Sequence, residues 1–195
     1  GKIAPGVSAR RRRENPLVML YRINAGKIPA EHWIQDPVVG GGRLIGEACH
    51  FIDYMQSMCG TRPTTVFAQR VGRQASGITD DQCVITLTFA DGSVGTVIYT
   101  AGGNSGLAKE RFEAHADGKS LIMDDFQETH LYSGSQHEVF KTPKRDKGFN
   151  AEINHLVQAV GQGSPSVMSF DDMATVTRAC LLAVRSLQSG SAYEI

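Results

Sequence analysis

The sequence lacks net charge, a long apolar run and any closely spaced cysteine pair. Its 20 basic and 20 acidic residues cancel, so composition gives no support to a nucleic-acid or membrane partner. No apolar stretch approaches the roughly 20 residues that span a bilayer, and the Gly/Pro/Arg-rich start has no apolar signal-peptide segment. The four cysteines show no C-x-x-C spacing, which favours reduced thiols in a cytoplasmic protein.

Signatures of a metal or nucleotide site are also missing. His130 and His137 have no cysteine or acidic frame around them, so no metal site is expected. No G-x-G-x-x-G motif occurs, and the strands described below are linked by hairpins and not by crossover helices. We therefore expect no cofactor-binding residues for a dinucleotide in this chain.

The pattern predicts an arm or linker over residues 1–15 and one folded domain over residues 16–195. The arm has no periodicity and includes the run Arg10–Arg13, for which a solvated linker is a simpler explanation than a nucleic-acid patch. The remaining length is sufficient to bury a core.

Alternating apolar residues and turn signals predict five or six strands joined mostly by hairpins over residues 83–141, and two further stretches with strand character precede them. Amphipathic helical patterns occupy the end of the chain, around residues 153–160 and 173–187. The fold class expected is α+β, an open and mostly antiparallel β-sheet with helices packed on one face. The stretches with strand character are 17–24, 64–71, 83–90, 94–100, 110–116, 120–124, 129–132 and 138–141.

The stretch Gly40–Asp53, GGGRLIGEACHFID, leads into a predicted helix over residues 43–58. Its three glycines could form a phosphate cradle or a flexible entry that lets the backbone approach another group closely. We favour the flexible entry, because no apolar strand runs into the glycines. Opposite the apolar stripe, helical spacing groups Arg43, Glu47, His50 and Tyr54 on one face. A solvated or structurally bonded histidine remains an alternative for His50.

This stretch resembles the GGGxLxDxGxHxxD signature of the C-terminal domain of Gfo/Idh/MocA oxidoreductases, which use NAD or NADP, mostly on sugars and polyols. His50 matches the histidine that in this family helps to move the proton of the substrate hydroxyl, and Asp53 matches the trailing aspartate. The family aspartate four residues before the histidine falls on Gly46, and Glu47 is the nearest carboxylate. The resemblance therefore implies His50 and Glu47 as catalytic candidates.

The family's N-terminal half is a Rossmann domain with a glycine fingerprint and a catalytic Glu-Lys-Pro segment, and this sequence contains neither. The resemblance implies that this chain is the substrate-binding and dimerisation domain of an NAD(P)-dependent dehydrogenase. NAD or NADP is then expected to bind the missing Rossmann domain, and this chain alone is expected to be inactive. A non-catalytic ligand-binding or regulatory module of the same fold is the alternative, which Gly46 favours.

Hydroxyl-rich substrates need several hydrogen-bonding groups around an apolar plate. The strand that ends at Asn24 and the loop around Trp33 offer such groups close to the glycine-led helix in sequence. The alternatives are a core position for Tyr21, a salt bridge for Arg22 and a packing anchor for Trp33. The substrate-binding candidates are Tyr21, Arg22, Asn24, His32, Trp33, Asp36 and Arg43.

In the strands predicted at 83–90 and 94–100, the residues expected on each of the two faces are mostly apolar or threonine. A solvated sheet face carries Lys, Glu or Gln instead. We therefore expect a homodimer formed sheet face to sheet face, or a tetramer built from two such dimers. Coverage of this face by residues 1–15 is the alternative.

Overall fold

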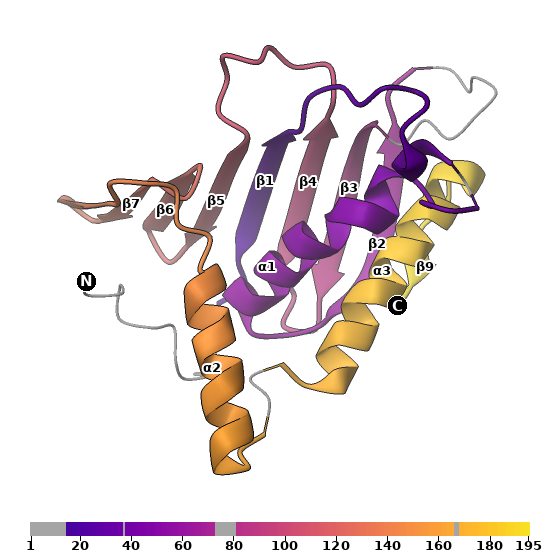
Figure 1. The fold of residues 1–195 in the computed structure, drawn as a ribbon. Helices are drawn as coiled ribbons and strands as arrows, with labels where there is room; N and C mark the ends of the chain where they lie inside the picture. The colour runs from indigo at the N-terminus through magenta and orange to yellow at the C-terminus, as the bar shows by residue number, and fades with distance from the viewer. Residues whose placement is uncertain (1–14, 37, 73–80, 166–167) are drawn as a thin grey trace.

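The computed structural model of the chain describes residues 15–36, 38–72, 81–165 and 168–195 (Figure 1). Within them, nine strands form a single sheet and three α-helices lie on one of its sides. This is the expected α+β architecture. The predicted arm, except its last residue Asn15, lies outside the described residues.

The sheet has the strand order β8-β7-β6-β5-β1-β4-β3-β2-β9. All neighbouring strands are antiparallel except β1 and β4, which pair in parallel with Val18 opposite Val94. The sheet is thus mostly antiparallel, as predicted. The strands are β1 (Val18–Asn24), β2 (Pro63–Arg70), β3 (Gln82–Phe89), β4 (Val94–Thr100), β5 (Glu110–Ala116), β6 (Lys119–Asp124), β7 (Glu128–Ser133), β8 (Gln136–Lys141) and β9 (Tyr193–Glu194).

The predicted helix over residues 43–58 is present, but its first part is wider than an α-helix. It begins as a π-helical segment, η2 (Leu44–Ala48), and continues as α1 (Cys49–Cys59). A π-turn departs from the period of 3.6 residues, so the polar face predicted from that period is wrong at its start. Arg43 is buried and does not share an exposed face with His50.

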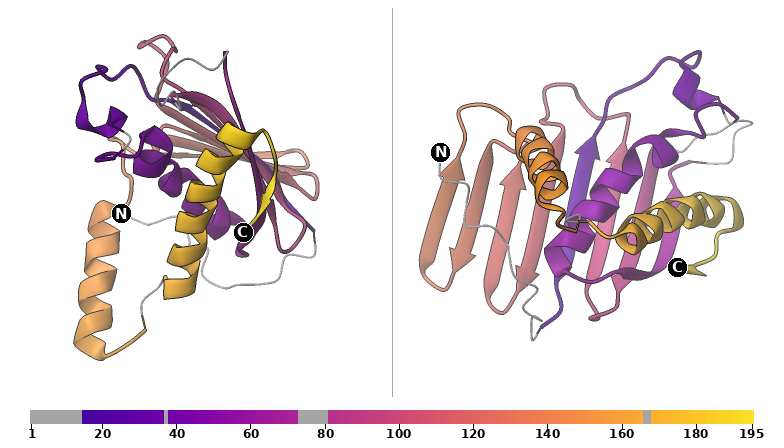
Figure 2. Two further views of the ribbon diagram at one scale, coloured as in Figure 1. Left: turned by 90° about the vertical axis from the view of Figure 1, so that its right-hand side faces the viewer. Right: turned by 60° about the horizontal axis from the view of Figure 1, so that its bottom comes forward.

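The core lies between one face of the sheet and the helices α1 and α3 (Phe170–Ser189) (Figure 2). Alternate residues of β3 face inward, in the pattern that the sequence predicts. Ser169 caps α3 by accepting a hydrogen bond from the backbone N–H of Asp172, as its sequence suggests. The helix α2 (Phe149–Gln162) lies on the same side of the sheet, yet none of its residues is buried.

The opposite face of the sheet has no helix over it within the described residues (Figure 2). Thr86 pairs with Thr96 there, and Val84 pairs with Ile98. These side chains are half-buried, while their neighbours in sequence face the core. The two-sided apolar character of β3 and β4 is therefore a property of the folded sheet.

A 3-10 helix, η1 (Trp33–Gln35), lies in the connection between β1 and η2. None of the helices in the described part of the chain has the length and apolar character needed to cross a membrane.

Candidate functional site

A cavity of about 960 Å³ lies between α1, α2 and the start of β5. Acidic, basic and aromatic side chains from both halves of the chain line it together. Three of the predicted site residues are among them, namely Tyr21, Glu47 and His50. The others that matter for the chemistry are Asp53, Tyr54, Lys109, Glu110, Phe126, Lys147, Glu152 and His155.

His50 is exposed to this cavity from the first turn of α1. Asp53 follows one helical turn later and lines the same cavity. Burial raises the pKa of the Asp53 carboxyl, and the charges of Asp172 and Glu152 add to this, whereas the nearby His50 opposes it. Asp53 and His50 thus line one cavity a helical turn apart, and the charge of His50 favours the ionised form of Asp53.

Glu47 lines the cavity as well, but its carboxylate is engaged by groups of the sheet. Tyr99 donates its hydroxyl to Oε2 of Glu47 at 2.6 Å, and Arg43 Nη2 lies 3.7 Å from the same oxygen. Lys109 Nζ lies 3.8 Å from Oε1. Burial, followed by the hydrogen bond to Glu47, raises the pKa of Tyr99, so the phenol remains a donor. These contacts fix the orientation of Glu47.

Gly46 occupies the position of the family aspartate. The Ile34 side chain lies so close to Gly46 that a larger residue there would require Ile34 to move. A Cβ on Gly46 would lie 2.7 Å from Cδ1 of Ile34, so that side chain fills the space. The backbone approach expected for the glycine triplet is confirmed at Gly40, where a Cβ would lie 2.4 Å from Cα of Ile34. The connection around η1 thus packs directly on the helix that carries His50.

The buried carboxylate of Glu110 holds two further groups of the cavity. Tyr21 donates its hydroxyl to Oε2 at 2.6 Å, and Lys147 Nζ lies 2.5 Å from Oε1. Burial and the hydrogen bond to Glu110 raise the pKa of Tyr21, in that order. A charge buried in this way must be paired, so Glu110 fixes the phenol and the ammonium in one place.

The β6–β7 turn places an aromatic ring in the cavity at a conformational cost. Asp125 and Phe126 both have positive φ, at 50° and 56°. The connection has three residues, 125–127, and the N–H of Gln127 donates to the carbonyl of Asp124 at 3.0 Å. Turns with positive φ at both central residues favour Asn-Gly, and a bulky residue with positive φ is strained. Lys147 Nζ lies 5.6 Å from the centroid of the Phe126 ring, and Tyr54 packs edge-on against that ring. Strain of this kind is typical of functional sites.

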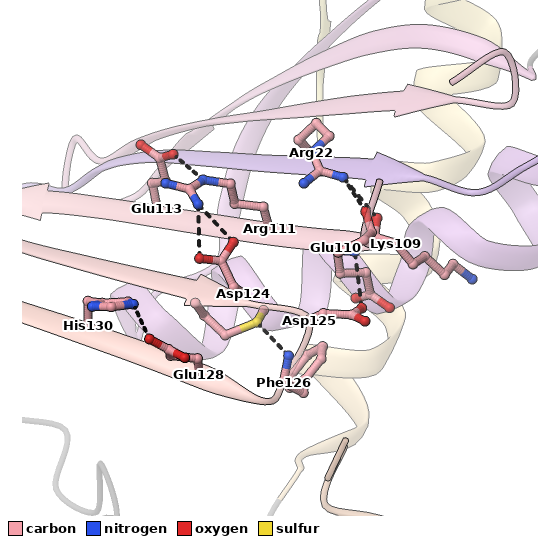
Figure 3. Close-up of polar contacts among 12 residues, drawn as sticks. Arg22, Lys109, Glu110, Arg111, Glu113, Asp124, Asp125, Phe126, Glu128 and His130 are labelled. Atoms are coloured by element: carbon pink, nitrogen blue, oxygen red, sulfur yellow. Dashed lines mark hydrogen bonds and ion pairs between the residues drawn. The ribbon is translucent and has the colours of Figure 1, made fainter. Parts of the chain in front are cut away.

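The remaining predicted substrate residues lie elsewhere. Arg22 points to the helix-free side and donates to the carbonyl of Ala108 at 2.6 Å (Figure 3). Asn24 lines a second, adjoining cavity. His32, Trp33 and Asp36 lie around η1 and line neither cavity.

These three residues of the η1 connection have local partners. His32 and Asp36 accept hydrogen bonds from nearby backbone N–H groups, and the pKa of Asp36 is lowered by two such bonds. Trp33 is 60% exposed. The apolar plate of the cavity is Phe126, and the role predicted for Trp33 finds no support in its position.

Sequence reasoning missed Glu110, Lys147 and Phe126 as members of the cavity. Each lies at the end of a strand or just before α2, far from the glycine-led helix in sequence. The only local signal is the Asp125–Phe126 pair at a hairpin turn, where a phenylalanine has no conformational advantage.

The described residues contain a single parallel strand pair, β1 with β4. This pair is not followed by a glycine-rich turn that opens a helix, which is the arrangement that binds a pyrophosphate. In the same part of the chain, no three His, Cys, Asp or Glu side chains gather as a metal site.

Comparisons with known proteins agree on the family. The model described as the GFO/IDH/MocA C-terminal domain matches residues 12–122, which is more than half of the chain. A search of curated protein sequences gives no match. Among solved structures, the chain is similar to an aldose-aldose oxidoreductase from Caulobacter crescentus complexed with glycerol, with a TM-score of 0.77 and 15% identity over 92% of this chain and 56% of that one.

A levoglucosan dehydrogenase in complex with NADH and levoglucosan has a TM-score of 0.74 and 18% identity, over 92% of this chain and 58% of that one. A UDP-N-acetylglucosamine 3-dehydrogenase from Acidithiobacillus ferrooxidans has a TM-score of 0.71 and 18% identity, over 89% and 54%. The chain thus spans little more than half the length of these structures. At such identities the likeness establishes the fold, and the family model establishes the membership. This chain belongs to the Gfo/Idh/MocA family of oxidoreductases, whose C-terminal domain it represents.

Proposed function

We propose that this chain is the substrate-binding and dimerisation domain of an NAD(P)-dependent dehydrogenase that acts on a sugar, a polyol or a related hydroxyl compound. The observation that carries the proposal is the convergence of His50, Asp53, Tyr21 and Lys147 on one cavity with an aromatic plate. Such a combination of a few polar groups and apolar surface suits a small hydroxylated ligand.

In this proposal His50 takes the proton of the substrate hydroxyl during oxidation of the carbinol carbon. An imidazole is suited to this task near neutral pH. Asp53 orients and stabilises the charged imidazole. It does so in place of the family aspartate, whose position is occupied by Gly46 in this chain. Lys147, held by Glu110, donates a hydrogen bond to another oxygen of the substrate, while Tyr21 gives its one hydroxyl proton to Glu110 and fixes that carboxylate.

Solved structures of similar fold support this class of substrate. They include complexes with levoglucosan, L-sorbose and glycerol, and two of these also contain NADH. The residues that hold the dinucleotide are proposed to lie in a separate Rossmann domain. Calorimetric titration of this chain with NADH and NADPH tests that assignment, and stoichiometric micromolar binding would contradict it.

The decisive experiment replaces His50 by asparagine in the complete enzyme. Loss of a general acid–base group lowers kcat by about 10²–10⁴-fold. Glu47→Gln is the matched comparison and should have a smaller effect, because Glu47 is bonded to Tyr99. If His50→Asn retained full activity, the alternative would prevail, and the chain would be a non-catalytic binding or regulatory module.

The proposed homodimer uses the helix-free face of the sheet, or forms a tetramer from two such dimers. Thr86 and Thr88 lie half-buried at the centre of the apolar half of this face. Changing both to lysine would bury like charges at the interface, so light scattering should show a dimer for the wild type and a monomer for the variant. A wild-type monomer would refute this part of the proposal. The thiols of all four cysteines are free, which supports our assignment of the enzyme to the cytoplasm.

A further inference from the structure

A second cavity, of about 540 Å³, adjoins the first, because Lys109 lines both. It lies where the chain leaves the carboxyl ends of β1 and β4, the parallel pair of the sheet. Three basic side chains line it and no carboxylate does, although the whole chain has equal numbers of both charges. These cations are Lys27, Lys109 and Arg145. Lys109 lies near Glu47 and Arg145 contacts Asp125, so within the described residues Lys27 supplies the charge of this cavity that is not already paired.

The three cations retain donors for a ligand. Lys27 is exposed and, within the described residues, takes part in no ion pair. Lys109 lies 3.8 Å from Glu47, which is a long contact for an ion pair. Arg145 contacts Asp125 through Nη2, and its other guanidinium N–H groups are not used in that contact. Figure 3 shows the Lys109 side chain directed away from Arg22.

The wall of this cavity is the loop 101–109, which the end of β1 holds in place. Asn24 Nδ2 donates to the carbonyls of Asn104 and Leu107 at 2.8 and 3.1 Å. Arg22 donates to the carbonyl of Ala108 at 2.6 Å. A loop fixed by such bonds loses little conformational entropy when a ligand binds.

Glycine permits the close approach of this loop to β1. A Cβ on Gly103 would lie 2.1 Å from Oδ1 of Asn24, so a larger residue there requires the Asn24 side chain or the loop to move. Gly102, Gly103 and Gly106 line the same cavity as the cations. The N–H groups of Gly102 and Gly106 already donate to Thr100 Oγ1 and Asn104 Oδ1, at 3.1 and 2.8 Å, which leaves the N–H of Gly103, of these three, as the backbone donor of this wall. Backbone N–H groups and cationic side chains together are the usual donors to phosphate and carboxylate oxygens.

We propose that this second cavity is a subsite for an anionic group of the substrate, a phosphate or a carboxylate, whose hydroxyl-bearing ring lies beside His50. The inference rests on the function proposed for the first cavity, and it narrows the substrate to sugar phosphates, sugar nucleotides or sugar acids. Lys27 provides the main charge at the outer end. Lys109, at the boundary of the two cavities, contacts both parts of the ligand.

The test is a titration of the isotope-labelled chain, followed by NMR, with glucose 1-phosphate, inorganic phosphate, neutral glucose and sodium chloride at matched ionic strength. The amides of Gly102, Gly103 and Gly106 should respond to the two phosphates, and should respond far less to glucose or to chloride. An equal response to chloride, or a response to glucose as strong as to glucose 1-phosphate, would overturn the inference.

Two variants make the test specific to the cavity. Lys27→Gln should weaken phosphate binding by about tenfold, the usual effect of losing one hydrogen bond to a charged group. Lys119→Gln removes an equally exposed charge at the opposite end of β5 and β6, and should change binding by less than about twofold, because exposed charges at that distance are screened. Equal effects of the two variants would show non-specific attraction and refute the subsite.

Titration with NADH identifies the source of the anion. If NADH moves the three glycine amides, with the same dependence on Lys27, and glucose 1-phosphate does not, the group is the cofactor's and the assignment to the substrate fails. Failure of the proposed function is distinguishable: full activity of His50→Asn would end the catalytic role of the first cavity, whereas the phosphate response of the second does not involve His50.

Discussion

The two helices at the end of the chain have similar amphipathic sequences and different surroundings. The helix α3 buries Val176, Ala179, Cys180, Ala183 and Ser186 against the sheet and α1. The helix α2 buries none of its residues, and its apolar side chains are exposed, namely Phe149, Ile153, Leu156, Val157 and Val160. An apolar stripe therefore indicates that a helix has a face to cover, and says nothing of what covers it.

The residues of the two stripes differ in size, and this difference has a physical meaning. Small side chains on α3, such as Ala179 and Ala183, allow it to lie close to β2. The stripe of α2 consists of large side chains that border the candidate cavity through Leu156 and Phe149. We infer that α3 belongs to the core and that α2 contributes mainly to the wall of the site.

The largest expected change in unfolding free energy comes from a charge placed on the buried face of α3. Ala183→Lys places a charge without a partner in the core, and should lower the free energy of unfolding by about 3 kcal/mol or more. Val157→Lys makes the same change in charge on the exposed face of α2 and should stay within about 0.5 kcal/mol of the wild type. Urea denaturation measures both, and equal losses would show that α2 is as well packed as α3.

Ser186 gives α3 a polar attachment to the sheet that α2 lacks. Its hydroxyl donates to the carbonyl of Ser191 at 2.6 Å and accepts from the N–H of Ala68 at 2.8 Å. Ser186→Ala leaves the buried N–H of Ala68 without its partner, and should cost about 1–3 kcal/mol in unfolding free energy. The control Ser135→Ala, at the exposed tip of the β7–β8 hairpin, should cost no more than about 0.5 kcal/mol. A neutral Ser186→Ala would show that water replaces the hydroxyl.

The start of α3 is also better defined than the start of α2. Ser169 caps α3, whereas the corresponding residue of α2 is Gly148, which provides no side-chain cap. Ser169→Ala should therefore cost about 1 kcal/mol in thermal or urea unfolding. Thr177→Ala, at an exposed position about two turns further along α3, is the control, and a loss of similar size there would argue against capping as the cause.

The smallest expected effect concerns Asp53. After burial, the charges of Asp172 on α3 and Glu152 on α2 also raise the pKa of its carboxyl. Its pKa is raised in the folded state, so its contribution to stability is present below pH 3.8 and is lost as the pH rises through the folded pKa. Asp53→Asn should therefore be slightly more stable than the wild type at pH 7, by about 0.5 kcal/mol or less.

At pH 3 that advantage should disappear, because the wild-type carboxyl is then protonated. Thermal unfolding at both values of pH measures the difference. An Asp53→Asn variant that is less stable at pH 7 would mean that electrostatic attraction to His50 outweighs the cost of burial.

The sheet was predictable from the sequence because each strand carries its own alternation and its own turn. The hairpin at Asp91–Gly92 and the inward set of β3, from Cys83 to Phe89, appear where the pattern places them. The parallel pairing of β1 with β4 was not predictable in this way. Those strands are separated by more than 60 residues of chain, so no local turn signal records their contact.

The candidate site was predictable only where it lies on one helix. Residues His50 and Glu47 share a short stretch, and spacing alone brings them near each other. Glu110 and Lys147 come from separate elements, and they meet His50 only after the sheet and α2 are in place. Arg43 was misplaced because a π-helical segment cannot be read from apolar spacing.

Periodicity, turn residues and the histidine-bearing stretch that resembles the family signature can all be read along the chain without the tertiary structure. These are properties of neighbouring residues, and they require no knowledge of distant contacts. The tertiary structure alone decided that Glu110 is buried between Tyr21 and Lys147, that Lys109 joins two cavities, and that α2 exposes the face that α3 covers. The physical reason is that burial and charge pairing depend on groups far apart in the chain, whose proximity arises only from packing.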